Sequence, residues 1–262
     1  MLPAVVNAQF VFTTNNGAIT ITGYTGNPTT LSIPGTTNGY AVVSIGNSAF
    51  LNKSSVTSVT IPDSVTNIGI SAFNSCIGLT NVQFGNGVLN IGGSAFQACS
   101  KLTTVVIPDG VVNVGSNAFY SCTSLSNAVL GVSVTNIAGF TFYNCSKLTS
   151  MTVPNSVTNI GNNAFYNCSG LTNIVFGSGV LNIGNSAFQS CAKLASLTLP
   201  NNITNVGSSA FASCTGLTNI LIGSGVINIG TSAFVGCSSL VSFSVEFLGI
   251  EWLPERRHLV ET

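Results

Sequence analysis

Apolar residues along this chain recur at a fixed step of 23 positions. The step is kept by a column of phenylalanines, a column of cysteines and a column of leucines. The phenylalanines are Phe50, Phe73, Phe96, Phe119, Phe142, Phe165, Phe188, Phe211 and Phe234, and the cysteines are Cys76, Cys99, Cys122, Cys145, Cys168, Cys191, Cys214 and Cys237. A period of roughly 20 to 50 residues indicates stacked units that bury their apolar faces against one another. The chain is therefore predicted to be a repeat solenoid of about nine 23-residue coils.

One period, residues 71–92, indicates what each coil contains. Ser71 stands where a helix N-cap would, and apolar residues follow it at helical spacing as far as Leu79. Val82 then lies between two polar neighbours, which is the alternation of a strand with one buried face. A glycine turn leads to a second extended segment at 88–92. Each coil is predicted to hold two short strands and a short helical turn.

The turn between the two strands alternates proline and glycine, as in Pro62 and Gly85. Proline presets φ for a tight turn and glycine permits positive φ, so either residue suits the position without a functional reason. The same two-coil period of 46 residues separates Lys101, Lys147 and Lys193. The duplicated unit is therefore predicted to be a pair of coils.

Composition excludes several classes of protein. Charged residues make up 5% of the chain, against about a quarter in an ordinary globular protein. Apolar runs fall short of the ~18 residues that a membrane helix needs. The formal net charge is zero, and the only basic cluster is Arg256, Arg257 and His258. A nucleic-acid binder needs a basic stripe, so the sequence predicts neither a nucleic-acid partner nor a transmembrane segment.

The cysteine column has three interpretations. Zinc sites need clustered Cys and His ligands, whereas these cysteines stand 23 residues apart and the only histidine is His258. The spacing does not exclude disulfides between neighbouring coils, because a stacking distance of about 4.8 Å falls within the range of Cα–Cα distances that a disulfide can bridge. The residues favour a buried row of free thiols behind the phenylalanines.

Catalytic candidates are few. Before residue 246 the acids are Asp63 and Asp109, and no histidine is present there for acid–base work. Both aspartates follow a turn proline, where a bond from the side chain to the backbone explains them. A phosphate-binding glycine loop that opens a helix is also missing. The sequence predicts no enzyme, no cofactor and no metal.

A column of asparagines, from Asn67 to Asn228 in steps of 23 residues, lies between aliphatic residues. These asparagines are expected to face solvent or to bond backbone groups of the neighbouring coil. This column is interpreted as architecture.

The outward positions of the first strand in each coil are the candidates for a binding face. They are uncharged and hold none of the aromatic or arginine anchors that are typical of tight interfaces. The candidate residues are Asn81, Gln83, Thr104, Val106, Asn127, Val129, Ser150, Thr152, Asn173, Val175, Ser196, Thr198, Asn219 and Leu221.

The repeat resembles the BspA-type leucine-rich repeat. The pattern Ala-Phe-x-x-Cys-x-x-Leu-Thr-x-Val-x-Ile-Pro-x-x-Val-Thr-x-Ile-Gly recurs in register, and the resemblance covers residues 31–245. Copies begin at Ala49, Ala72, Ala95, Ala164 and Ala210. The resemblance implies a right-handed leucine-rich-repeat coil, usually found in secreted or cell-surface proteins of bacteria and some protists. It implies adhesion or protein binding and no enzymatic activity.

Four segments are expected along the chain. Residues 1–9 resemble the remnant of a secretory signal peptide, and residues 10–46 an N-terminal cap with a long first coil. The leucine-rich repeats follow at 47–245. Residues 246–262 hold all four glutamates and the only tryptophan. They are expected either to cover the open end of the last coil as an atypical cap or to form a disordered tail.

Three non-catalytic functions stay open. The first is a secreted or surface protein that mediates adhesion or binds a protein, with its ligand on the sheet face. The second is a structural protein whose solenoids stack into filaments through their ends. The third is binding of a glycan or another regular lattice by the Ser, Thr and Asn columns.

Overall fold

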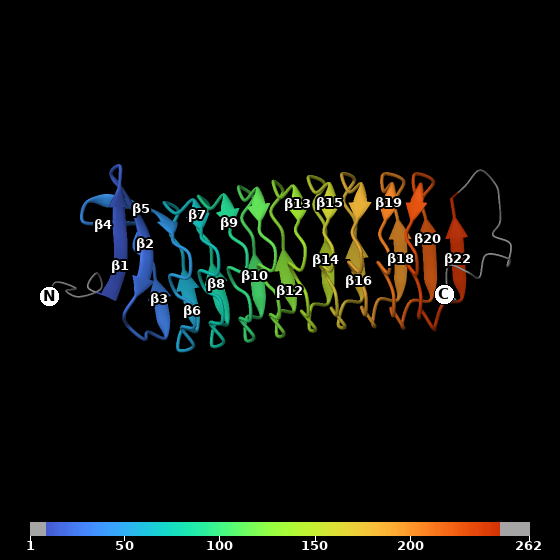
Figure 1. Ribbon diagram of the computed structural model, residues 1–262, viewed down its shortest axis with the longest axis horizontal. Coiled ribbons are helices and arrows are strands. Elements are labelled where there is room, and N and C mark those ends of the chain that lie inside the picture. Colours follow the sequence, from blue (N-terminus) through green and yellow to red (C-terminus); the bar gives the residue numbers. More distant parts are fainter. Residues whose placement is uncertain (1–8, 247–262) are drawn as a thin grey trace.

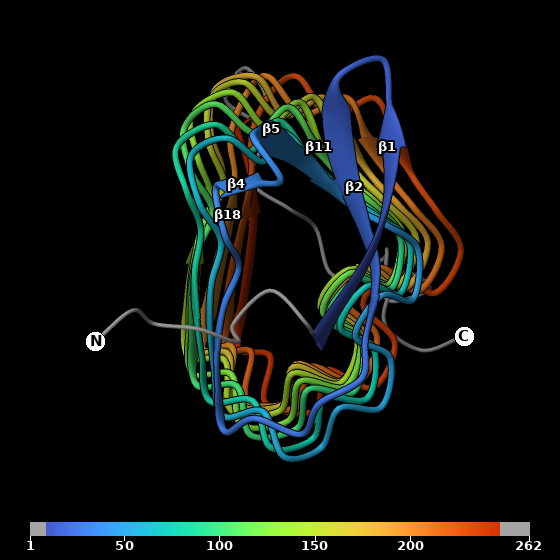
Figure 2. The same cartoon turned by 90° about the vertical axis from the view of Figure 1, so that its left-hand side faces the viewer.

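The computed structural model describes residues 9–246, which form a rod-shaped solenoid with β1 (Phe10–Asn15) and β22 (Ser242–Val245) at opposite ends (Figure 1). Seen from one end of the rod, the coils lie one behind another around a shared interior (Figure 2). Each regular coil gives a longer strand to one side and a two-residue strand to the other. The predicted repeat solenoid is confirmed.

The longer strands carry the candidate binding face. They are parallel and in register, so residues 23 apart are neighbours from Ser58 onward. These strands are β3 (Thr30–Ser32), β6 (Ser58–Thr60), β8 (Asn81–Gln83), β10 (Thr104–Val106), β12 (Asn127–Val129), β14 (Ser150–Thr152), β16 (Asn173–Val175), β18 (Ser196–Leu199), β20 (Asn219–Ile222) and β22.

Within the described residues, a continuous sheet of 12 strands forms the side of the solenoid opposite the longer strands. It begins with the antiparallel hairpin of β1 and β2 (Ala18–Tyr24), whose turn residues Asn16 and Gly17 both have positive φ, as a tight hairpin requires. The remaining strands are β4 (Thr36–Thr37), β5 (Tyr40–Ile45), β7 (Asn67–Ile68), β9 (Asn90–Ile91), β11 (Asn113–Val114), β13 (Asn136–Ile137), β15 (Asn159–Ile160), β17 (Asn182–Ile183), β19 (Asn205–Val206) and β21 (Asn228–Ile229).

The predicted helical turn is wrong, because residues 9–246 contain no α-helix. Ser71 and Ser75 have φ values of 55° and 59°, in the left-handed region, so Ser71 does not cap a right-handed helix. The N–H groups of Ser71, Phe73 and Ser75 donate to carbonyls of the next coil at 2.7 to 2.9 Å. These N–H groups therefore do not donate to the carbonyl four residues earlier, which is the hydrogen bond that defines an α-helix. We call the segments that replace the helical turn, such as residues 138–149, the turn edge.

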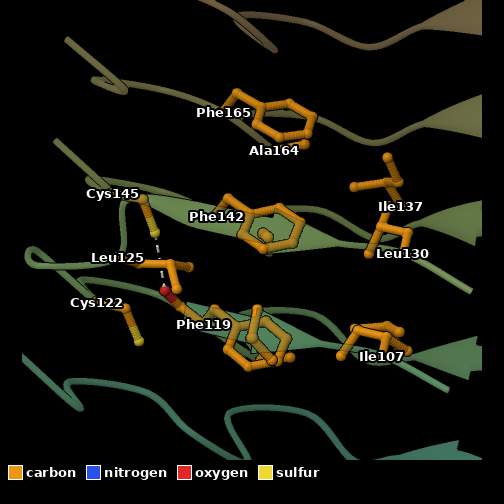
Figure 3. Packing of buried hydrophobic residues seen from close by; sticks show 14 of the residues in the cluster. Ile107, Phe119, Cys122, Leu125, Leu130, Ile137, Phe142, Cys145, Ala164 and Phe165 are labelled. Atoms are coloured by element: carbon orange, nitrogen blue, oxygen red, sulfur yellow. Dashed lines mark hydrogen bonds between the residues drawn. The ribbon is translucent and has the colours of Figure 1, made fainter. Parts of the chain in front are cut away.

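The core is a stack of phenylalanines along the rod axis. Rings from Phe50 to Phe234 lie 4.9 to 5.6 Å apart between centroids, with interplanar angles of 2° to 12°. Figure 3 shows three of them, Phe119, Phe142 and Phe165, beside the cysteine column. One identical ring per coil fills the same volume in each layer, which explains the strict 23-residue step.

The longer strands do not form one unbroken sheet. Ladder pairing is interrupted between β8 and β10, between β12 and β14, and between β16 and β18. At each break a glycine coil is followed by a proline coil. The breaks divide the candidate binding face into blocks.

Candidate functional site

The structure brings the predicted binding-face residues together in two columns along the rod. The strands carry an exposed, buried, exposed pattern, so the residues on either side of each central apolar residue face outward. Every predicted residue is exposed except Leu221, which is half-buried. These side chains therefore share one surface, while their use in binding stays a prediction.

A hollow of about 310 Å³ lies on this face at the break between β12 and β14. One inward-facing position there is occupied by Ala128, where neighbouring coils hold Val105 and Met151. A smaller side chain beside an interrupted strand pair leaves room that the regular coils fill. The hollow is lined by Asn127, Ala128, Val129, Leu130, Val132, Ser150, Thr152 and Pro154.

The sequence interpretation missed a row of aromatic side chains on the turn edge. Tyr120, Tyr143 and Tyr166 stack with centroid distances of 4.7 and 4.9 Å and interplanar angles of 3° and 5°. All three are partly exposed. The signal in the sequence was a Phe-Tyr pair that recurs three times at 23 residues. The predicted binding face comprised only the outward positions of the first strands, so it did not include these tyrosines.

Phe140 stands beside this row in a strained conformation. Its ring is 37% exposed and lies 5.8 Å from that of Tyr143, tilted by 42°. Its φ of 61° is in the left-handed region, which costs a bulky residue about 1 to 2 kcal/mol. The other coils hold Ser or Asn at this position with similar φ, for example Asn117 and Asn163. An exposed aromatic residue kept in such a conformation is a candidate for function.

Replacing Phe140 by asparagine is expected to change the free energy of unfolding by less than about 1 kcal/mol. Asparagine tolerates the left-handed region, so the relief of strain offsets the lost contact of the ring with Tyr143. Urea unfolding of the two proteins measures the difference. A loss above about 2 kcal/mol would show that the ring is a structural element of the core.

The cysteines are free and buried, as the sequence analysis favoured. Each thiol donates to the carbonyl of the phenylalanine 26 residues earlier at 3.1 to 3.3 Å, as Cys145 does to Phe119 (Figure 3). Burial raises the pKa of Cys122 and of Cys168 to about 12. A thiol with so high a pKa and no access to solvent is a poor nucleophile and a poor metal ligand.

The asparagine column forms a ladder of side chains. Asn113, for example, donates its Nδ2 to the Oδ1 of Asn90 at 2.8 Å, and similar bonds join Asn159 to Asn136 and Asn205 to Asn182 at 2.9 and 2.7 Å. The predicted bonds between coils are present in the column, with amide oxygens as acceptors in place of backbone groups. The column is architectural in the sense that it ties neighbouring coils together.

Chemistry-bearing groups do not gather elsewhere in the described part of the chain. Asp63 and Asp109 accept backbone N–H groups of Asn86 and Val132 in the next coil at 2.7 and 3.2 Å, so they join the turns of neighbouring coils and do not form the local side-chain turn that was expected. Within residues 9–246, no three His, Cys, Asp or Glu side chains are placed to hold a metal ion. A search of the same residues for a helix long and apolar enough to cross a membrane also finds none. The expected features of residues 1–8 and 247–262, a signal-peptide remnant and an end cap or tail, lie outside the described residues.

Three solved structures of bacterial proteins resemble this solenoid. A leucine-rich repeat protein from Bacteroides ovatus is 27% identical with a TM-score of 0.68, over 94% of this chain and 76% of that chain. A leucine-rich repeat protein from T. pallidum is 25% identical with a TM-score of 0.56, over 88% and 87% of the two chains. A leucine-rich cell surface protein from Faecalibacterium prausnitzii is 28% identical with a TM-score of 0.52, over 98% and 97%. No curated relative matches the chain.

The family comparison agrees with the repeat seen in the structure. The model of the BspA-type leucine-rich repeat region, which holds six copies of the repeat, matches residues 43–171 and 135–249. Together these matches span the regular coils with their phenylalanine and cysteine columns. The chain therefore belongs to the BspA-type leucine-rich repeat family.

Proposed function

We propose that the chain is a non-catalytic leucine-rich repeat protein of the cell surface or the extracellular space that binds a protein through the face of its longer strands. The observation that carries this proposal is the hollow between β12 and β14. It lies in an uncharged surface near the middle of the rod, and a concave apolar site is where a partner side chain is best desolvated.

The surroundings of the hollow have the chemistry of a protein interface. Val106, Val129 and Val175 lie in one outward column and are 58%, 46% and 48% exposed. Thr152 lies between Val129 and Val175 in this column, and polar side chains that include Asn127 and Ser150 flank the valines. An apolar centre with a polar rim is the usual anatomy of a protein–protein interface, and exposed apolar groups that gather on one face favour a binding role.

The surface location draws support from a relative. The structure from Faecalibacterium prausnitzii is described as a leucine-rich cell surface protein. Free thiols are unusual in an oxidising environment, but the eight thiols of this solenoid are buried and so are protected from oxidation and exchange. The description of the relative therefore supports a secreted or surface-attached protein, and the buried thiols are compatible with that location.

Replacing Val129 by arginine is expected to weaken binding of a protein partner at least tenfold, because the long charged side chain would occupy the hollow. The full chain would be tested against an array of purified extracellular proteins, and affinities would be measured for each hit. Val112→Arg is the matched control, since Val112 is an exposed valine (40%) next to β11 in the other sheet.

The expected result is at least one protein that binds the wild type and Val112→Arg alike and loses affinity for Val129→Arg. Equal affinity for all three chains would remove the hollow from the binding site. An array without a single bound protein would argue against the proposal as a whole.

The in-register columns also support a second candidate, assembly of solenoids into filaments. Coils of nearly identical width and sequence stack within one chain through parallel strands, and the same pairing between chains would extend the rod. The polar members of the columns, such as Thr152 and Thr198, which lie two coils apart, leave binding of a regular lattice as a further alternative.

A further inference from the structure

The turn edge combines three regular features that the proposed protein-binding face does not use. The first is the row of Tyr120, Tyr143 and Tyr166 with Phe140 beside it. The second is a row of amide and hydroxyl groups on the residues that follow the tyrosines, in which Asn167 donates to Asn144 at 2.8 Å and Asn144 donates to Ser121 at 3.3 Å. The third is a file of exposed lysines at Lys101, Lys147 and Lys193.

The charge of this edge has one sign. Among the described residues the carboxylates are Asp63, Asp109 and Glu246. Both aspartates lie in the turns that follow the longer strands, whereas the lysines lie just before those strands, at the opposite end of the coil. No described carboxylate therefore stands in the turn edge to neutralise the lysines. Tyr143 and Lys147 are four residues apart, so their Cα atoms are within about 14 Å of each other.

The spacing of the groups selects a kind of ligand. The tyrosines recur once per coil at 4.7 and 4.9 Å, and the lysines once per two coils, or about 9.6 Å along the axis. Across the five coils from Lys101 to Lys193, a linear polymer that lies along the rod would meet a cation at every second coil, and phenol, amide and hydroxyl groups at the three central coils. A polysaccharide of alternating neutral and acidic sugars has this order of groups, since a pyranose ring with its glycosidic oxygen is close to one coil in length.

We propose that the turn edge binds an extended polysaccharide in which every second sugar carries a carboxylate. The lysines pair with the carboxylates, while the phenol and amide rows hydrogen-bond the sugar hydroxyl groups. The tyrosine rings are stacked face to face and offer mainly their edges. Phe140 is tilted out of that stack and offers an exposed ring to the apolar C–H side of a sugar.

An acidic peptide fits the same edge less well. Side chains on one face of an extended peptide recur at about 6.7 Å, which matches neither the one-coil nor the two-coil spacing. A peptide would also leave most of the phenol and amide groups without regular partners. This inference concerns a surface separate from the face of the longer strands, so its failure would leave the proposed protein-binding function untouched.

The test measures affinity of the full chain for three soluble polymers at low and at high ionic strength. Sodium hyaluronate carries a carboxylate on every second sugar, dextran is neutral, and poly-L-glutamate is an acidic peptide. We expect hyaluronate to bind, with an affinity that falls as salt is added because the carboxylates meet lysines at an exposed edge. Dextran and poly-L-glutamate are expected to bind at least about tenfold more weakly.

Two variants locate the site. The triple change Lys101→Gln, Lys147→Gln and Lys193→Gln is expected to lower the affinity for hyaluronate about tenfold, while Asp63→Asn with Asp109→Asn, at the opposite end of the coil, leaves it unchanged. Phe140→Asn is expected to lower it about threefold without a fall in melting temperature.

Three results would overturn the inference. One is failure of hyaluronate to bind at low ionic strength, and another is retention of full affinity by the triple lysine variant. The third is equal or tighter binding of poly-L-glutamate, which would assign the edge to acidic peptides.

Discussion

Replacing Phe142 by alanine is expected to lower the free energy of unfolding by about 3 to 5 kcal/mol. Its ring is fully buried and stacks between Phe119 and Phe165 at centroid distances of 5.5 and 5.3 Å. Alanine would leave a cavity in the middle of the rod, and both neighbouring rings would lose a stacking partner. The solenoid cannot close this gap easily, because the backbone bonds between coils fix the spacing of the layers.

Urea unfolding monitored by circular dichroism measures this loss. In a repeat protein, stability is close to a sum of coil and interface contributions, so weakening a central interface is expected to separate the unfolding of the two halves as well. Phe140→Asn is the control, because it removes an aromatic ring from the same coil at an exposed position. A Phe142→Ala chain as stable as Phe140→Asn would contradict the idea that the stacked rings hold the coils together.

The free energy of unfolding is expected to fall steeply above pH 9 through ionisation of the thiols in the unfolded chain. Burial raises the pKa of Cys76 and Cys237 from 9.0 to about 11 and that of Cys122, Cys168 and Cys214 to about 12. The unfolded chain then releases thiol protons above pH 9 that the folded chain keeps. The stabilisation is fully present below the unfolded pKa of 9.0 and is lost as pH rises through the folded values.

The expected effect is large because eight thiols act in the same direction. Each contributes at most about 1.4 kcal/mol per pH unit between its two pKa values, so the column together lowers the free energy of unfolding by several kcal/mol per unit. That is comparable with the total stability of an ordinary domain, about 5 to 15 kcal/mol. Urea unfolding at a series of pH values, with thiolate absorbance as a second signal, measures the slope.

A variant with Cys122, Cys145 and Cys168 replaced by alanine supplies the control for the alkaline transition. It starts from a lower stability, yet its free energy should fall less steeply above pH 9 because three of the eight titrating groups are gone. The same slope in both proteins would show that tyrosine and lysine titration, and not the buried thiols, causes the alkaline unfolding.

The 23-residue period was sufficient to predict the solenoid, the two strands of each coil and the outward columns, because buried and exposed residues alternate with backbone geometry. Ala72, Phe73 and Cys76 have helical spacing, yet they are buried by overlapping tight turns in which an N–H group donates to the carbonyl three residues earlier. Apolar spacing records which side chains point inward. It does not record where the N–H groups of Ser71 and Ser75 donate, and those bonds to the next coil exclude the helix.

The surface features were harder to predict for a related reason. The hollow lies beside the small side chain of Ala128 and at the break between β12 and β14, which are local features that the repeat pattern does not reveal. Phe140 was also hard to predict, because a phenylalanine at this position is unusual only once the backbone there is known to have a left-handed φ. The departures from the repeat that mark candidate sites fall largely in one coil, between Ala128 and Phe140.

The most direct test is light scattering together with negative-stain microscopy of the purified chain over a wide concentration range. These measurements show whether the protein stays a monomer, with its sheet face and turn edge free to bind partners, or assembles through the ends of its coils. We expect single short rods whose mass stays that of one chain at every concentration, with both the sheet face and the turn edge open to partners. Ordered filaments that lengthen with concentration would contradict this, because the chain would then serve as a building block that acts through the ends of its coils.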